Sequence, residues 1–164
     1  MSCHDTVYPV ELTQADFEHL LRLRTGLRRF LRWSEEQARA AGLTSAQHQL
    51  LLAVRGHPGD VPPTIGEIAD YLVLRHHSAG ELIDRAEAAG LVVRSPDPRN
   101  GTQVRVSLTD TGRATLTGLA ETHLAELAHL APTMRALWEA LEANAESAPR
   151  SLAVQAPHAP SLTV

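Results

Sequence analysis

The sequence has no lysine, only one cysteine and few aromatic residues, and it contains no long apolar run. Every permanently cationic side chain is therefore arginine. Arginine suits bidentate contacts with phosphate and guanine, but a compositional bias of the source genome is the simpler explanation for the absence of lysine. Cys3 has no partner for an internal disulfide, as expected in a reducing compartment. No segment approaches the roughly 20 apolar residues of a membrane span, and Met1 is not followed by a basic and then apolar signal. We therefore expect a cytoplasmic protein without membrane contact.

The motifs of common enzyme classes are missing as well. There is no Gly-x-Ser-x-Gly motif, no phosphate-binding loop and no cysteine in an activating sequence context. The sequence therefore predicts neither an enzyme nor a bound cofactor. The length of 164 residues and the hydrophobic content of 43% are those of a compact domain with extensions, not of a disordered chain.

The net charge of −4 argues against a protein held on DNA by bulk charge alone. The distribution of charge matters more than its sum, because binding depends on the potential at the contact surface. Carboxylates gather near the N-terminus and after Glu121. The arginines gather in two groups, one early in the chain (Arg22, Arg24, Arg28, Arg29 and Arg32) and one between Leu72 and Leu108 (Arg75, Arg85, Arg94, Arg99 and Arg105).

The spacing of apolar residues predicts a mainly helical chain with one hairpin. Two capping boxes, Thr44 with Gln47 and Thr64 with Glu67, start the second and third helices. The expected helices cover residues 15–41, 45–56, 65–71 and 75–89, and alternation predicts strands at 91–94 and 103–108.

The last third of the chain is also predicted to be helical. Thr109 or Asp110 caps a long fifth helix, and Pro132, at a favourable first helical position, is predicted to start a separate last helix. Residues 1–13 have no clear periodicity and are expected to form a loose lead-in. Residues 149–164 are rich in proline, alanine and serine, and we expect a disordered tail.

Short motifs follow one another through the middle of the chain, namely Ile65–Ala69, Leu82–Arg85, Gly90–Val92, Asp97–Arg99 and Leu108–Gly112. Each motif is weak alone, but their order and spacing, from about Leu43 to Gly112, resemble the MarR family of winged helix-turn-helix transcription regulators. The resemblance implies a mainly α fold with a small β-hairpin wing. It also implies that residues 43–109 read DNA and that residues 1–42 and 110–148 form a helical dimerisation region.

The resemblance further implies a homodimer on double-stranded DNA with a pseudo-palindromic operator. On that plan the first turn of the fourth helix faces the major groove, where Arg75 would donate to a guanine. The start of the third helix suits a phosphate. The expected DNA-binding residues are Thr64, Arg75, His76, His77, Ser78, Arg85, Arg99 and Asn100.

The entry to the fourth helix departs from the family pattern. Small hydroxyl residues are common in the family where this chain has Arg75, His76, His77 and Gly80. The base preference of better-known relatives therefore does not carry over. Gly80 costs a helix about 1 kcal/mol relative to alanine, so it either admits close approach of the DNA backbone or is a tolerated weak spot.

The tip of the hairpin has two interpretations. Under the family plan, Arg99 enters the minor groove, and Asp97 holds the wing by pairing with a nearby arginine. The alternative is an ordinary polar turn, because Asn-Gly supports a hairpin by itself. The recognition-type helix that precedes the tip favours the first interpretation.

Members of the family usually couple DNA binding to a small ligand between the dimer helices and the reading head. Trp33 would stack on a planar acid there, Arg29 would offer charge, and His48 falls where relatives often place an aromatic residue. The alternative is that Trp33 and His48 belong to the core or to an interface. The predicted function is a dimeric repressor released by a small ligand or a stress signal.

Two other functions remain as alternatives. One is a winged-helix protein-interaction module that does not bind DNA, which the negative net charge supports. The other is a metal-sensing regulator, since Glu126 has the helical spacing of a metal ligand to both His123 and His129. A lone helical His/Glu pair is usually a solvated face, so no metal site is predicted. Cys3 precedes the first helix, and we treat it as incidental to any redox sensing.

Overall fold

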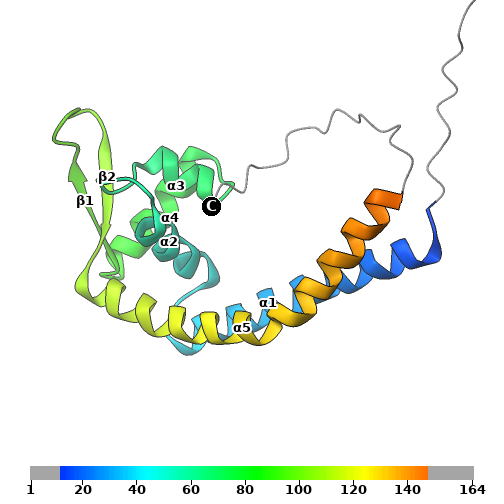
Figure 1. The fold of residues 1–164 in the computed structure, drawn as a ribbon. Helices are drawn as coiled ribbons and strands as arrows, with labels where there is room; N and C mark the ends of the chain where they lie inside the picture. The colour runs from blue at the N-terminus through cyan, green and yellow to red at the C-terminus, as the bar shows by residue number, and fades with distance from the viewer. Residues whose placement is uncertain (1–11, 148–164) are drawn as a thin grey trace, which may run out of the picture. The chain divides into compact units, whose positions relative to one another are not determined.

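The computed structural model describes residues 12–147, which form five helices and one two-stranded sheet within that range (Figure 1). This mainly α fold with a small hairpin confirms the predicted fold class. Cys3, the predicted lead-in before Leu12 and the predicted tail at residues 149–164 lie outside the described residues. In chain order the elements are α1 (Gln14–Ala40), α2 (Ser45–Gly56), α3 (Ile65–Tyr71), α4 (His76–Ala88), β1 (Val92–Pro96), β2 (Val104–Leu108) and α5 (Asp110–Ser147).

The chain divides into two compact units. The central unit, Arg28–His129, contains α2, α3, α4 and the hairpin together with the adjoining parts of α1 and α5. The terminal unit is described over residues 12–27 and 130–147, which are the outer parts of α1 and α5. Within residues 12–147, no helix is both long enough and apolar enough to cross a membrane.

Both predicted capping boxes are present at the starts of α2 and α3. Thr44 accepts a hydrogen bond from the backbone of Gln47, whose side chain in turn accepts from the Thr44 N–H. Thr64 and Glu67 make the same reciprocal pair at α3. Each box satisfies two backbone donors that a helix start leaves without partners.

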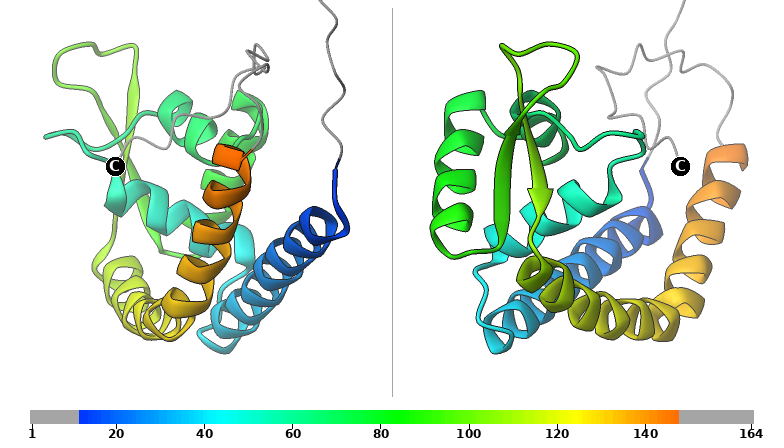
Figure 2. Two further views of the ribbon diagram at one scale, coloured as in Figure 1. Left: turned by 45° about the vertical axis from the view of Figure 1, so that its right-hand side comes forward. Right: turned by 90° about the vertical axis from the view of Figure 1, so that its left-hand side faces the viewer.

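The hairpin pairs β1 with β2 in antiparallel register, with Val92 opposite Leu108 and Pro96 opposite Val104. A further bridge joins Thr64 to Arg105, and the Val106 N–H donates to the Pro63 carbonyl. The residues before α3 are therefore bound to β2. In Figure 2 the hairpin rises beside α4, and the two elements are in contact.

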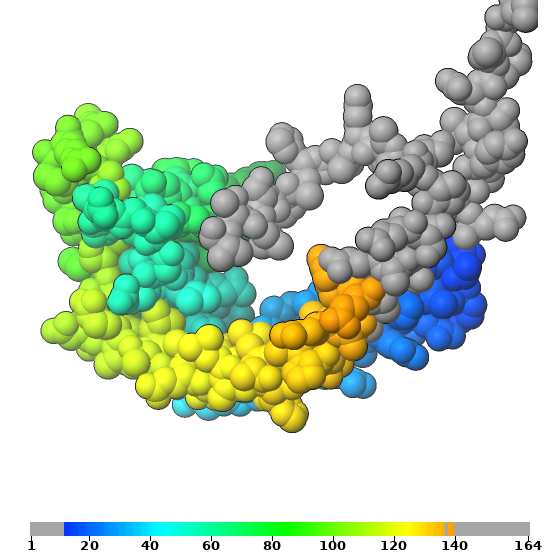
Figure 3. All heavy atoms as spheres, in the orientation of Figure 1, coloured from blue at the N-terminus to red at the C-terminus, as the bar shows by residue number. Residues whose placement is uncertain are grey.

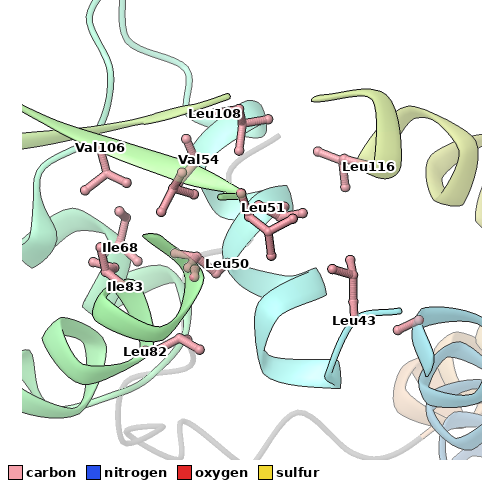
Figure 4. Packing of buried hydrophobic residues seen from close by; sticks show 14 of the residues in the cluster. Leu43, Leu50, Leu51, Val54, Ile68, Leu82, Ile83, Val106, Leu108 and Leu116 are labelled. Atoms are coloured by element: carbon pink, nitrogen blue, oxygen red, sulfur yellow. The ribbon is translucent and has the colours of Figure 1, made fainter. Parts of the chain in front are cut away.

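The core of the central unit is made of aliphatic side chains from α2, α3, α4 and the hairpin, joined by Leu43 and by residues from the adjoining parts of α1 and α5 (Figure 4). Leu50, Ile68, Ile83 and Val106 are fully buried, one from each of α2, α3, α4 and β2. Burying one such side chain contributes roughly 1.5–3 kcal/mol. This shared core therefore holds α3 and α4 in a fixed relation to the hairpin.

The predicted helix break at Pro132 is wrong. α5 runs without interruption from Asp110 to Ser147, and Pro132 lies inside it. Proline removes one backbone donor and crowds the preceding turn, at a cost of about 3 kcal/mol in a helix interior. Half-buried Leu130 and Met134 flank the proline at helical spacing, so packing on both sides outweighs the local preference. The other helix and strand boundaries agree with the predictions to within two residues.

Candidate nucleic-acid interface

The start of α4 presents an exposed group of donors. Arg75 is the N-cap residue of α4, and its side chain makes no capping hydrogen bond. Arg75, His76 and His77 are exposed, whereas Ser78 is half-buried. The Nε2 atom of His77 lies 3.2 Å from Oε1 of Glu81, one helical turn further on. Arg75 and His76 thus stand at the end of the helix that the family plan places in a DNA groove.

The other predicted residue of α4, Arg85, is exposed in the last turn of the helix. The buried face of α4 consists of Ala79, Leu82, Ile83 and Ala86. Arg85 lies outside this buried stripe, on the flank of the helix, and its side chain is exposed. It is available to a partner on the outer side of α4.

Thr64 is placed at the start of α3, but its own donors are already used. Its N–H and its hydroxyl both donate to Oε2 of Glu67, at 2.7 and 2.8 Å. The backbone hydrogen bond from Thr64 is the main cause that lowers the pKa of Glu67 below its ordinary value, and Arg105 adds to it. A phosphate at this helix start would therefore bind backbone amides of the first turn, not the Thr64 side chain.

Asp97 is buried at the base of the hairpin tip, with 4% of its surface exposed. Its Oδ1 atom accepts the backbone N–H groups of Arg99 and Asn100 at 2.7 and 3.2 Å. Its Oδ2 atom accepts from Nε and Nη2 of Arg105, each at 2.6 Å. The hydrogen bond from the Arg99 backbone, followed by that from Arg105, holds the pKa of Asp97 below its ordinary value. Asp97 is therefore an ionised anchor of the tip.

The anchored tip leaves two predicted DNA contacts on the outside. Arg99 and Asn100 are exposed, and Oδ1 of Asn100 accepts hydrogen bonds from the N–H and hydroxyl of Thr102. In Figure 3 the tip projects beyond the rest of the central unit. The Arg99 guanidinium thus sits on a projection whose backbone is held by Asp97.

Arg105 connects the tip to the start of α3. Besides its contacts with Asp97, its Nη1 atom donates to the Pro62 carbonyl at 2.6 Å and lies 3.9 Å from Glu67. The Arg105 side chain is only 15% exposed. Sequence reasoning expected Asp97 to pair with an arginine, and the position of Arg105 on β2 supplies it. One guanidinium therefore links the wing to the loop before the helix-turn-helix.

A second arginine, Arg94 on β1, binds the carboxylates of α4. Its guanidinium lies 2.7 Å from both Asp84 and Glu87 and donates to the Gly80 carbonyl at 3.3 Å. The Arg94 backbone N–H also donates to Glu87, which is the main cause that lowers the pKa of that carboxyl. Sequence reasoning missed this role, because the pairing joins a strand to a helix across a turn. Two acidic groups of α4 are thereby neutralised.

His123 is the centre of a group of rings contributed by α1, α2 and α5. Its ring centroid lies 4.9 Å from that of Trp33, 4.7 Å from that of His48 and 6.2 Å from that of Phe30. Its Nδ1 atom is 2.7 Å from the Leu119 carbonyl, so Nδ1 carries the proton. When the ring is neutral, Nε2 therefore accepts from the Ser34 hydroxyl at 2.8 Å.

The structure brings together two of the three predicted ligand residues. Trp33 and His48 both contact His123, whereas Arg29 is exposed and lies outside these ring contacts. His48 is 7% exposed, and burial, with a further contribution from His123, lowers its pKa. The sequence indicates His123 as a candidate metal ligand on the fifth helix, but it does not indicate the central place of His123 among these rings. The sequence does not indicate that His123 contacts Trp33 and His48, because the three residues belong to three different helices.

A cavity of about 290 Å³ lies elsewhere in the central unit. It is lined by the end of α2, the following loop, β2 and the start of α5, and includes Arg55, His57, Ser107 and Arg113. None of Arg29, Trp33 and His48 lines it. Over the described part of the chain, no group of three or more histidine, cysteine, aspartate or glutamate residues is arranged to hold a metal ion.

Two helices in a helix-turn-helix arrangement, followed by a hairpin with an exposed arginine at its tip, define a winged helix-turn-helix protein. Residues 41–101 match the sequence model described as MarR family. The central part of the chain is therefore similar to MarR family transcription regulators. No curated protein sequence matches it.

Solved structures with the same fold include three informative relatives. The transcriptional repressor CouR, bound to a 23-mer DNA duplex, is 28% identical, with 82% of this chain and 99% of CouR covered and a TM-score of 0.61. AbsC, a MarR family regulator from Streptomyces coelicolor, is 23% identical over 85% of this chain and 97% of its own, with a TM-score of 0.63. A mutant of MepR from S. aureus, bound to an oligodeoxyribonucleotide, is 18% identical over 84% and 96% of the two chains, with a TM-score of 0.56.

Proposed function

We propose that the protein is a homodimeric, sequence-specific repressor that binds a pseudo-palindromic operator in double-stranded DNA and is released by a small ligand or a stress signal. The observation that carries this proposal is the separation of charge on the central unit. Exposed cations stand at the start of α4 and at the wing tip, whereas Asp84, Glu87 and Asp97 are bound by arginines. A surface with paired acids and free cations suits a polyanion, in spite of the net charge of −4.

The predicted DNA contacts have three different roles in this proposal, in the major groove, in the minor groove and on the sugar-phosphate backbone. Arg75, His76, His77 and Ser78 read base edges in the major groove, where arginine pairs with guanine. Arg99, with Asn100 beside it, enters the minor groove, and Arg85 and the first turn of α3 at Thr64 contact the sugar-phosphate backbone. The binding of CouR to a DNA duplex supports the duplex binding on which this assignment rests.

Dimerisation is supported by apolar surface on the long helices. Such surface on a protein marks an interaction site when it is contiguous. In this proposal residues 1–42 and 110–148 supply the dimer contacts and residues 43–109 read the operator. The large apolar side chains exposed on α1 are Phe17, Leu20, Leu21, Leu27 and Leu31, and those on α5 are Leu124, Leu127 and Trp138.

The effector site in this proposal is the ring cluster around His123. Trp33 and His48 contact His123 from α1 and α2, so a ligand that inserts there separates a helix of the proposed dimer region from the reading head. A planar acid fits the aromatic lining. Arg29, exposed on α1, would supply the charge partner only after its side chain turns toward the cluster.

The experiment that tests the proposal is selection of bound duplexes from a random-sequence library, followed by affinity measurements at fixed salt. Arg99→Ala is expected to weaken binding by on the order of 1–3 kcal/mol. Arg39→Ala, which removes an exposed arginine at the end of α1, is the charge-matched control and should change little. Arg75→Ala should change the preferred base at one position of each half-site.

The results also separate the proposal from its alternatives. A protein that recovers no motif and has no salt-dependent duplex affinity is an interaction module, not a repressor. The same motif for the wild type and Arg75→Ala would remove Arg75 from base reading. Elemental analysis of the purified protein decides the metal-sensing alternative. A monomer by light scattering would contradict the proposed dimer.

A further inference from the structure

Three helices of the central unit end in the same way. At each end a leucine N–H donates to the carbonyl of an alanine five residues earlier: Leu43 to Ala38, Leu74 to Ala69, and Leu91 to Ala86, at 2.9, 2.8 and 2.9 Å. The residue before each leucine donates to the carbonyl three residues earlier. This is the Schellman arrangement, which requires a left-handed residue immediately before the leucine.

Two of these left-handed positions are glycine, and the third is valine. Gly42 and Gly90 have φ values of 78° and 71°, and Val73, between α3 and α4, has a φ of 53°. Glycine adopts this region without penalty, whereas a β-branched side chain is strained in it. Among the described residues, Val73 is the sole non-glycine residue with positive φ. The chain therefore places its least suitable residue type at the turn of the helix-turn-helix.

The valine turn also differs from the glycine turns in its exposure. Leu43 and Leu91 are 5% and 6% exposed, but Leu74 is 40% exposed and Val73 is 91% exposed. The Val73 side chain therefore gains almost nothing from packing within the molecule that would offset its strain. A strained residue that internal contacts do not explain is a sign of function.

The position of Val73 indicates what its methyl groups meet. Val73 is two residues before Arg75, the N-cap of α4, and the start of a recognition helix is the part that approaches base edges. The one apolar group on the base edges of the major groove is the thymine methyl. The hydrogen bonds of Val73 and Leu74 to α3 fix the backbone of the turn, and the Val73 methyl groups are exposed to a partner.

We infer that Val73 reads a thymine methyl group at the edge of each operator half-site, an assignment that rests on the proposed DNA binding. Valine at this position then contributes to base specificity, whereas glycine would give the more stable turn. The reading surface then extends two residues before Arg75, and it includes an apolar contact beside the charged and polar ones.

The test uses a duplex selected from a random-sequence library by the wild-type protein, and copies in which each thymine is replaced singly by deoxyuridine, which lacks only the methyl group. For the wild type, one replacement per half-site should lower affinity about four-fold. This is the effect expected when one buried group the size of a methyl is lost from the interface. Val73→Gly should melt at a higher temperature, bind the unmodified duplex less tightly and show no loss at that replacement. Val73→Asn should behave in the same way, because asparagine tolerates the left-handed region and has no methyl groups.

The deoxyuridine comparison separates a lost methyl contact from a loosened turn, because a loosened turn lowers affinity for both duplexes equally. The inference is overturned if the wild type and both variants have the same ratio of thymine to deoxyuridine affinity at every position. It is also overturned if the selected half-site contains no thymine. A wild-type protein that binds no duplex would instead overturn the proposed function.

Discussion

Arg105 holds Asp97 through two nitrogen atoms, Nε and Nη2, each 2.6 Å from the same carboxylate oxygen. The third nitrogen of this guanidinium reaches the Pro62 carbonyl. Because Asp97 in turn accepts the backbone N–H groups at the tip, the wing tip and the loop before α3 are parts of one hydrogen-bonded network. Arg105 and Asp97 themselves contact no DNA in the proposed complex, so they act by placing Arg99.

Asp97→Asn is expected to lower both thermal stability and DNA affinity without removing a DNA contact. The pKa of Asp97 is lowered, so its charge stabilises the fold above the ordinary aspartate range near pH 4. That contribution is lost as the pH falls through the lowered pKa. The difference in melting temperature between the wild type and Asp97→Asn should therefore shrink on acidification below about pH 4. A constant difference would show that the charge is not what Asp97 supplies.

Arg94→Met is expected to weaken DNA binding about ten-fold, which corresponds to roughly 1.4 kcal/mol of binding free energy. Arg94 contacts no DNA in the proposed complex, but its loss frees Asp84 and Glu87 on the recognition helix. The effect should diminish at high salt, because repulsion between these carboxylates and phosphates is screened.

The double variant Arg94→Met with Asp84→Asn is the control for that electrostatic cause. It should recover part of the lost affinity, since it removes one of the two freed charges. If it binds no better than Arg94→Met alone, the wing attachment and not the charge is what Arg94 provides.

His48→Gln is expected to make the protein less sensitive to mild acid. Burial, and then His123, lower the pKa of His48, so folding favours its neutral form. Stability is therefore present above the unfolded-state pKa of about 6.5 and is lost as the pH falls below it. Melting temperatures between about pH 7.5 and 5, a window that brackets that value, should fall more steeply for the wild type than for His48→Gln. Parallel curves would contradict this prediction.

Gly80→Ala is expected to raise stability and lower DNA affinity together. A Cβ atom at Gly80 would meet no atom within 4 Å, so the substitution should gain about 1 kcal/mol of helix stability, or roughly 2–4 °C in melting temperature. Gly80 follows His76 by one turn on the outer side of α4, where a methyl group would hold the DNA backbone away.

Gly118→Ala in α5 is the matched control for this prediction. Its Cβ atom would also meet nothing within 4 Å, so it should raise the melting temperature similarly. Its affinity for DNA should stay at the wild-type value. If Gly80→Ala also binds like the wild type, the glycine in α4 is a tolerated weak spot and not a site of close approach.

Much of the fold could be predicted because its signals are local. The capping boxes at Thr44 and Thr64 need residues only three positions apart, and Gly42 and Gly90 mark helix ends through their own backbone preference. The error at Pro132 has the opposite origin, since a local breaker was overridden by packing along α5.

The candidate site was only partly predictable, because some of its contacts are local in sequence and others are not. The exposed residues from Arg75 to His77 and at the wing tip follow from motif and order. The ties of Arg94 to Asp84 and of His123 to Ser34 join residues that are distant in sequence or lie on different elements. The left-handed Val73 could not be predicted, because nothing in its side chain favours that backbone.

The bound tip of the wing has a consequence for binding entropy. Asp97 fixes the amides of Arg99 and Asn100, and Asn100 fixes Thr102, before any partner arrives. Ordering a free loop on a surface consumes part of the association energy, whereas a preorganised loop spends little. In the proposed complex the hairpin would therefore enter the groove with its tip backbone already ordered, and the exposed Arg99 side chain would lose freedom on binding.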